Sequence, residues 1–209
     1  MGAAIAGYAL GTIPSADIAT RLATGGSKDL RSEGSGNPGA ANAIKVLGAR
    51  WGAGVMAADI GKGAAASALG RRLAGDTGAH VGGVASVVGH CHPVWSGFRG
   101  GKGVAASVGQ CAVTFPAYVP FDLAIAWATA STPLKSRAHA ATVVSSTAWV
   151  LGGFLWWRRR WPNAWGPRPT AALPIANAIS SAVILNRFAA AKAGRITAAT
   201  NITSKSATR

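Results

Sequence analysis

The sequence predicts an all-α membrane protein, a bundle of six or seven transmembrane helices, some of them short or broken. Hydrophobic residues make up 49% of the 209 residues and charged residues only 13%, whereas soluble domains carry roughly 25% charged residues. Long apolar stretches recur along the chain at lengths that suit bilayer spans. The 28 glycines indicate helices that pack closely in lipid.

These stretches, in chain order, are residues 2–22, 51–69, 79–94, 104–130, 140–157 and 173–193. The first has no basic segment before it, so it is interpreted as a membrane helix rather than a cleaved signal. The fourth is too long for one upright span and contains Pro116 and Pro120, so it is one broken span or two short helices. The two readings place the C-terminal half of the chain on opposite sides of the membrane. We expect one membrane domain over 1–193 and a basic, disordered tail over 194–209.

Basic residues predict the orientation. The chain has 21 Lys and Arg against six Asp and Glu, a formal charge of +15, and the cations lie between apolar stretches rather than on polar helices of the nucleic-acid-binding kind. With the N-terminus outside, the loops at 23–50 and 95–103 hold six cations and the loop at 70–78 holds two. This asymmetry predicts a multi-pass protein of the cell membrane with both longer loops in the cytoplasm.

The first candidate site is the glycine-rich loop at 31–42, followed by Lys45. Gly34, Gly36 and Gly39 leave the backbone accessible, so its N–H groups could turn towards an anion, with Ser35, Asn37 and Asn42 as side-chain donors. The spacing also fits G-x-G-x-x-G, but a dinucleotide site needs a preceding buried strand, which is absent from the sequence pattern. A tight turn between helices is the structural alternative.

The second candidate is the loop at 89–103. Arg99 and Lys102 flank Gly100 and Gly101, so cations and amides could converge on a phosphate. Gly103 stands where a Walker A loop has Ser or Thr, so ATP hydrolysis is not indicated. His90 and His92 have no nearby carboxylate in the sequence, which predicts no metal site and leaves His90 either catalytic or orienting.

Asp59 and Lys62 are charges inside an apolar stretch. At i and i+3 they share a helix face and can pair, and intramembrane charge points to function. A structural ion pair is an equally weighted alternative. Asp17 and Asp122 are weaker cases of the same kind.

Together, in this order, the two loops resemble the signature blocks of the PlsY family, membrane acyltransferases that acylate glycerol 3-phosphate from acyl phosphate. The first block resembles 34–42, the second resembles 89–103, and the element at 59–63 also matches. The resemblance implies lysophosphatidic acid as product, no cofactor, the lipid bilayer as environment and a soluble enzyme that supplies the acyl phosphate. An activated donor needs alignment and oxyanion stabilisation rather than a covalent nucleophile.

The resemblance assigns catalysis to Lys102, Ser35 and His90. It assigns substrate or phosphate binding to Gly34, Gly36, Asn37, Gly39, Asn42, Lys45, Arg99, Gly100, Gly101, Gly103 and Arg137. The chain departs from the family pattern at Ala41, Lys45, Ala106 and Ala140, and its segment around Asn186 and Arg187 lacks the family's His and Glu. A diverged homologue without catalysis, or a transporter of a small phosphorylated anion, is the alternative.

Overall fold

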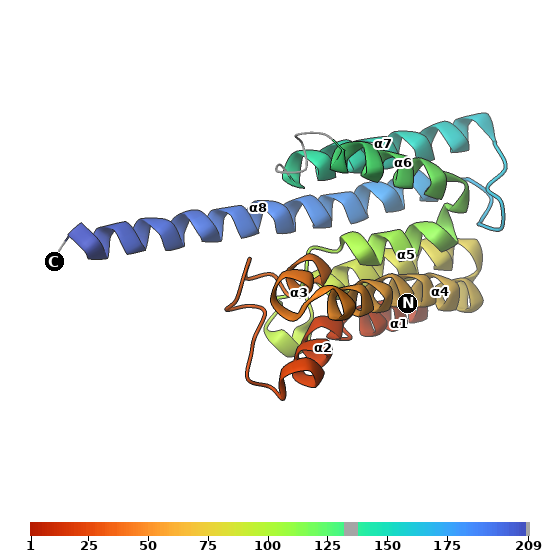
Figure 1. Ribbon diagram of the computed structural model, residues 1–209. Helices are drawn as coiled ribbons and strands as arrows, with labels where there is room; N and C mark the ends of the chain where they lie inside the picture. Colours follow the sequence, from red (N-terminus) through yellow and green to blue (C-terminus); the bar gives the residue numbers. More distant parts are fainter. Residues whose placement is uncertain (132–137, 208–209) are drawn as a thin grey trace.

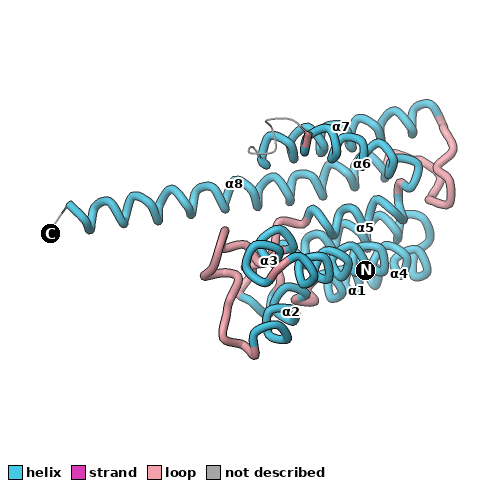
Figure 2. Tube along the Cα trace, viewed as in Figure 1, coloured by secondary structure: helices cyan, strands magenta, loops and turns pink. Residues whose placement is uncertain are grey.

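The computed structural model describes residues 1–131 and 138–207, and every regular element in that part of the chain is a helix. The elements in order are α1 Gly2–Gly11, α2 Ser15–Thr24, α3 Ala40–Leu47, α4 Ala49–Cys91, the 3₁₀ turn η1 Val94–Ser96, α5 Val104–Thr114, the 3₁₀ turn η2 Pro116–Tyr118, α6 Val119–Ala130, α7 Ala138–Arg159 and α8 Ala172–Ala207. In Figure 1, α8 runs between α6 and α7 on one side and α1, α4 and α5 on the other. Figure 2 shows the loops gathered at the two ends of this bundle.

Helix α4 is a hairpin of two helices joined at Ala74 and Gly75, whose backbone angles are not helical. Its halves pack closely, since a Cβ on Gly70 would collide with the Gly78 carbonyl oxygen. Gly7 in α1 meets the backbone of Gly82 in the same way. The missing side chains therefore allow backbone contact between the two halves of α4, and between α1 and the second half, as expected for helices that pack in lipid.

The stretch at 104–130 is a pair of helices with a break between them, which both readings of the sequence allow. Pro116 begins η2, and Val104–Thr114 and Pro116–Thr129 meet at an angle of 115°. By length and composition, His139–Arg159 and Ala172–Ala191 could each cross a membrane, and the bent pair would add a third span. The count of six or seven spans stays a prediction.

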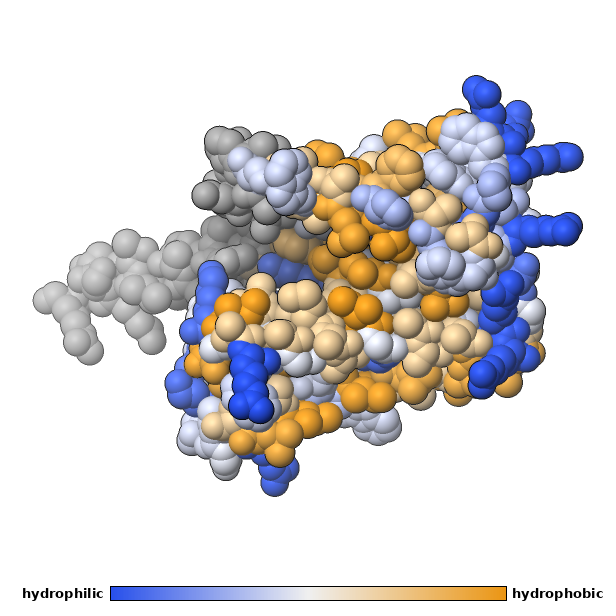
Figure 3. Space-filling model, turned by 45° about the vertical axis from the view of Figure 1, so that its right-hand side comes forward, coloured by the Kyte–Doolittle hydropathy of each residue, from blue (hydrophilic) through white to orange (hydrophobic). Residues whose placement is uncertain are grey.

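The bend also decides which loops share an end. After α7 the chain reaches the end that holds the α4 turn, where Arg71 donates from Nη1 to the Trp165 carbonyl at 3.1 Å. This end therefore carries Arg71, Arg72, Arg158, Arg159, Arg160 and Arg168. The end for which the sequence counted two cations therefore carries six, so the loop charges alone do not fix the orientation. Figure 3 shows a hydrophobic band with hydrophilic residues at both ends.

Helix α8 continues to Ala207, so its backbone is helical over most of the stretch predicted to be a disordered tail. In Figure 1 this part projects past α2 and α3.

Candidate active site

The two loops meet at one end of the bundle. Arg31 forms a bidentate ion pair with Asp17 of α2, with N–O distances of 2.7 and 3.0 Å, and its Nε donates to the Arg99 carbonyl at 3.4 Å. The hydrogen bond to Asp17 raises the pKa of Arg31 above its ordinary value, against the opposing effect of burial. A permanently charged Arg31 thus holds both loops to α2.

Asn42 fixes the first loop from inside. Its Oδ1 accepts from the Ser35 amide at 2.8 Å, and its Nδ2 donates to the Leu30 and Glu33 carbonyls, both at 3.0 Å. Gly34 has a φ of +59°, and a Cβ there would collide with Asn42 Oδ1. Asn42 is only 2% exposed, so it positions the loop, and its amide is not turned towards a substrate as the sequence suggested.

A buried charge cluster lies beneath the loops. Lys62 Nζ is 2.8 Å from Asp59 Oδ1 and donates to the Ile13 carbonyl at 3.0 Å, while His90 Nδ1 lies 3.4 Å from the same carboxylate oxygen. Asp59, Lys62 and His90 are 2%, 7% and 8% exposed. The expected ion pair is present, and His90 does have a carboxylate neighbour, one that is distant in sequence.

These side chains line a cavity of about 30 Å³, together with Pro38 from the first loop and Gly100 and Gly101 from the second. The two loops and the buried charge cluster thus meet around one narrow cavity.

The second loop folds back on the end of α4. Gly100 N–H donates to the Cys91 carbonyl and Gly101 N–H to the His90 carbonyl, both at 3.1 Å. A Cβ on Gly101 would collide with the His90 ring. In the first loop, the amides of Ser35, Gly36 and Gly39 are likewise bonded inside the protein. These five amides are bonded within the protein in this arrangement, so anion binding by the loops stays a prediction, and the glycines allow close packing.

Free backbone donors lie just beyond, at the start of α5. Gly103 is its N-cap, with a φ of +87°, and no side chain of the described residues caps the helix. The first amides of a helix lack partners within it, and they carry the positive end of its dipole. Lys102 immediately precedes Gly103, so a cationic residue adjoins the free amides at the start of α5.

Arg187 of α8 closes the second loop from the other side. It donates from Nη2 to the Gly100 carbonyl at 2.7 Å and from Nε to the Gly101 carbonyl at 3.3 Å. The next residue, Phe188, lies under Lys102 Nζ at 4.2 Å from the ring centroid. Burial, and then the charge of Arg187, lower the pKa of His92 below its ordinary value.

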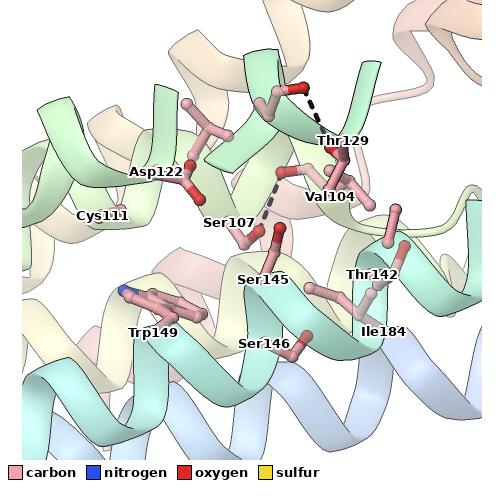
Figure 4. A pocket seen from close by; sticks show the side chains of 13 residues that line it. Val104, Ser107, Cys111, Asp122, Thr129, Thr142, Ser145, Ser146, Trp149 and Ile184 are labelled. Carbon is pink, nitrogen blue, oxygen red and sulfur yellow. Dashed lines mark hydrogen bonds between the residues drawn. The ribbon is translucent and has the colours of Figure 1, made fainter. Parts of the chain in front are cut away.

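A larger cavity of about 410 Å³ begins beside this turn. It lies among α5, α6, α7 and α8, and Figure 4 shows Val104 and Ile184 at one end and Cys111 and Trp149 at the other. Ile184 also approaches Gly103, so the near end of the cavity adjoins the start of α5. The lining is largely apolar carbon with a few hydroxyl groups.

The remaining predicted residues are arranged more loosely. Ser35, Lys45 and Arg99 have exposed side chains and Asn37 is half-buried, at the same end but outside the small cavity. Arg137 lies outside the described residues. Sequence reasoning missed Arg187, although a cation in an apolar stretch was a signal for it. Among the described residues no group of three His, Cys, Asp or Glu side chains could hold a metal ion.

Comparison with known families decides the assignment. The family model described as glycerol-3-phosphate acyltransferase matches residues 1–199. The chain belongs to this family. Glycerol-3-phosphate acyltransferases of Thermoanaerobacter sp. (strain X514) and Ruegeria pomeroyi are 38% and 40% identical to it over 154 and 149 residues. These matches cover 74% and 71% of the chain and 76% and 72% of the relatives.

The fold of this acyltransferase is also found in solved structures. Crystal structures of PlsY, an integral membrane glycerol 3-phosphate acyltransferase, in glycerol 3-phosphate and lysophosphatidic acid forms, each match with a TM-score of 0.70 at 24% identity. The first match covers 95% of this chain and 94% of that one. The prediction of an all-helical membrane enzyme is confirmed.

Proposed function

We propose that this acyltransferase takes its acyl group from acyl phosphate and transfers it to the 1-hydroxyl of glycerol 3-phosphate, forming lysophosphatidic acid. The observation that carries the proposal is the meeting of Lys102 with the uncapped start of α5, at the mouth of a 410 Å³ largely apolar cavity. A donor with an anionic head and an apolar chain fits that combination.

The reaction needs few groups from the protein. The hydroxyl oxygen of glycerol 3-phosphate attacks the acyl carbon, the bond from that carbon to the phosphate oxygen breaks, and the leaving phosphate carries away the hydroxyl proton. Lys102 and the α5 amides stabilise the oxyanion and the leaving phosphate. Ser35, Asn37, Lys45 and Arg99 come from exposed or half-buried positions at the same end and serve the phosphate of the acceptor.

His90 acts through the second loop in this scheme. Its carbonyl and ring both contact Gly101, and its Nδ1 faces Asp59. It therefore positions the turn that presents Lys102, which is the orienting role left open by the sequence.

Acyl transfer by the purified protein in detergent tests the proposal. A long-chain acyl phosphate and glycerol 3-phosphate should give lysophosphatidic acid, whereas acyl-CoA should not. Lys102→Ala should lower kcat/KM by roughly 10–100-fold, the size expected for a lost charge-assisted bond. Lys28→Ala is the matched control, because Lys28 pairs with Glu33 at the surface. No product from a folded preparation would favour a homologue without catalysis.

The location follows as part of the same proposal. A water-soluble phosphorylated acceptor and a donor made by a soluble enzyme place both loops on the cytoplasmic face of the cell membrane. The exposed positions Ser35 and Thr170 lie at opposite ends. In intact spheroplasts, an impermeant maleimide should label Thr170→Cys and should reach Ser35→Cys only after permeabilisation. The reverse pattern would invert the proposed orientation.

A further inference from the structure

The 410 Å³ cavity has more polar groups on its wall than a plain alkyl chain requires. Side chains of α5, α6 and α7 contribute hydroxyl groups along its length, and α6 contributes a carboxyl group. These polar lining residues are Ser107, Asp122, Thr129, Thr142, Ser145 and Ser146.

Two of the wall's polar groups have no strong protein partner. The buried indole Nε1 of Trp149 has no oxygen or nitrogen acceptor within the described part of the chain, and only the weakly accepting thiol of Cys111 lies beside it. Trp149 is only 7% exposed. Asp122, in the first turn of α6, lines the same cavity and makes no hydrogen bond or ion pair with any described residue. A buried N–H without a partner is costly, so such a donor indicates a missing acceptor.

Figure 4 shows that these two groups lie at the same end of the cavity. Asp122 and Trp149 come from facing helices, with Cys111 beside them, while Val104 and Thr142 lie at the other end. Seven residues separate Val104 from Cys111 along α5, a rise of about 10 Å. At roughly 1.2 Å per bond of an extended chain, that distance corresponds to about eight bonds.

We propose that the preferred donor carries a hydroxyl group near the middle of its acyl chain, bound between Asp122 and Trp149. The inference rests on the proposed function, because it requires the acyl chain to enter this cavity from the Lys102 end. A hydroxyl donates to the carboxylate and accepts from the indole N–H, so it satisfies both groups at once. A plain chain satisfies neither, and sites built to bind a hydroxyl reject the analogue that lacks it.

The position of Asp122 in the first turn of α6 offers a structural explanation of the carboxylate. Acidic residues are favoured there by the helix dipole. That explanation does not account for the indole N–H of Trp149, which has no strong acceptor, belongs to another helix and faces the same space.

A matched panel of donors tests the proposal. Purified protein is assayed with octadecanoyl phosphate and with its analogues hydroxylated at carbon 2 or near the middle of the chain, and kcat/KM is compared within each variant. We expect about a tenfold preference for the mid-chain hydroxyl, from two hydrogen bonds of modest net strength. The carbon-2 hydroxyl should give no advantage, because it lies at the phosphate end.

Variants separate specific recognition from a general change in the cavity. Trp149→Phe keeps the ring and removes the N–H, and Asp122→Ala removes the acceptor, so each should reduce the ratio at least threefold. Trp127→Phe, on an α6 side chain that is 74% exposed, should leave the ratio unchanged. Equal or better use of the plain donor by the wild-type protein would overturn the inference while leaving the proposed function intact. No lysophosphatidic acid from any donor would overturn both.

Discussion

Replacing Asp59 alone should be among the most damaging single changes in this protein. Asp59 and Lys62 are 2% and 7% exposed, and Nζ lies 2.8 Å from Oδ1. Asp59→Leu leaves the ammonium buried with one remaining bond, to the Ile13 carbonyl. Breaking a buried pair from one side costs about 3–5 kcal/mol.

The double variant Asp59→Leu, Lys62→Met should recover most of that loss. Removing both charges also removes the desolvation penalty, and apolar replacements of buried pairs are often close to neutral. In the double variant the Ile13 carbonyl still lacks the hydrogen bond from Lys62. The double variant therefore stays less stable than the wild type by about 1–3 kcal/mol. A coupling free energy of about 2 kcal/mol or more between the two positions follows.

Thermal unfolding in detergent, followed by tryptophan fluorescence, measures these effects. For a chain of this size the single change corresponds to a drop in Tm of about 10 °C. Asp76→Ala is the control, because Arg71 Nε and Asp76 Oδ1 are 3.0 Å apart but both side chains are over 40% exposed, and an exposed pair contributes at most about 1 kcal/mol. A single variant as stable as the control, or a double variant no better than the single one, would refute this reasoning.

Two further predictions concern the second loop and the helix packing. Arg187→Ala should lower kcat/KM by at least tenfold, because the Gly100 and Gly101 carbonyls lose their donor. Arg187→Lys should restore part of the activity. Unchanged kinetics in Arg187→Ala would show that these hydrogen bonds do not position the second loop for catalysis. In α4, Gly63→Ala should destabilise the fold by a few kcal/mol, because its Cβ would collide with the α5 backbone, an overpacking effect. Gly61→Ala, with open space around the position, should be neutral or slightly stabilising, and equal unfolding temperatures for the two variants would contradict this packing argument.

Local patterns predicted most of the helices and the two loops, but the stretch at 2–22, predicted as one membrane helix, is two helices, α1 and α2, which are separated at Pro14. Apolar stretches rich in small residues mark helices, and prolines at 116 and 120 mark the break that separates α5 from α6. The pairing of Asp59 with Lys62 follows from their spacing on one helix. Each of these features is decided within a few residues of the chain.

Features that depend on distant contacts were beyond the sequence. His90 reaches Asp59 across the two halves of α4, and Arg187 reaches the second loop from α8. Which amides are free is also a tertiary property, because Gly101 donates to a residue on the preceding helix. The charge balance of the two ends depends on such contacts as well, since the sequence left open which end the Arg158–Arg160 segment occupies.

The glycines connect the packing to the chemistry. Contacts of Gly63 with Ala106 and of Gly109 with Ile60 bring α5 against the first half of α4. Gly103 lies against Cys91, so the start of α5 is beside the end of α4. The second loop then spans a short gap, and its glycines fit against His90 where a side chain would not. Lys102 is thereby held at the uncapped helix end by backbone geometry. The proposed activated acyl donor would need mainly such a fixed electrostatic site. Close helix packing and the positioning of the proposed catalytic cation, Lys102, therefore have the same structural origin.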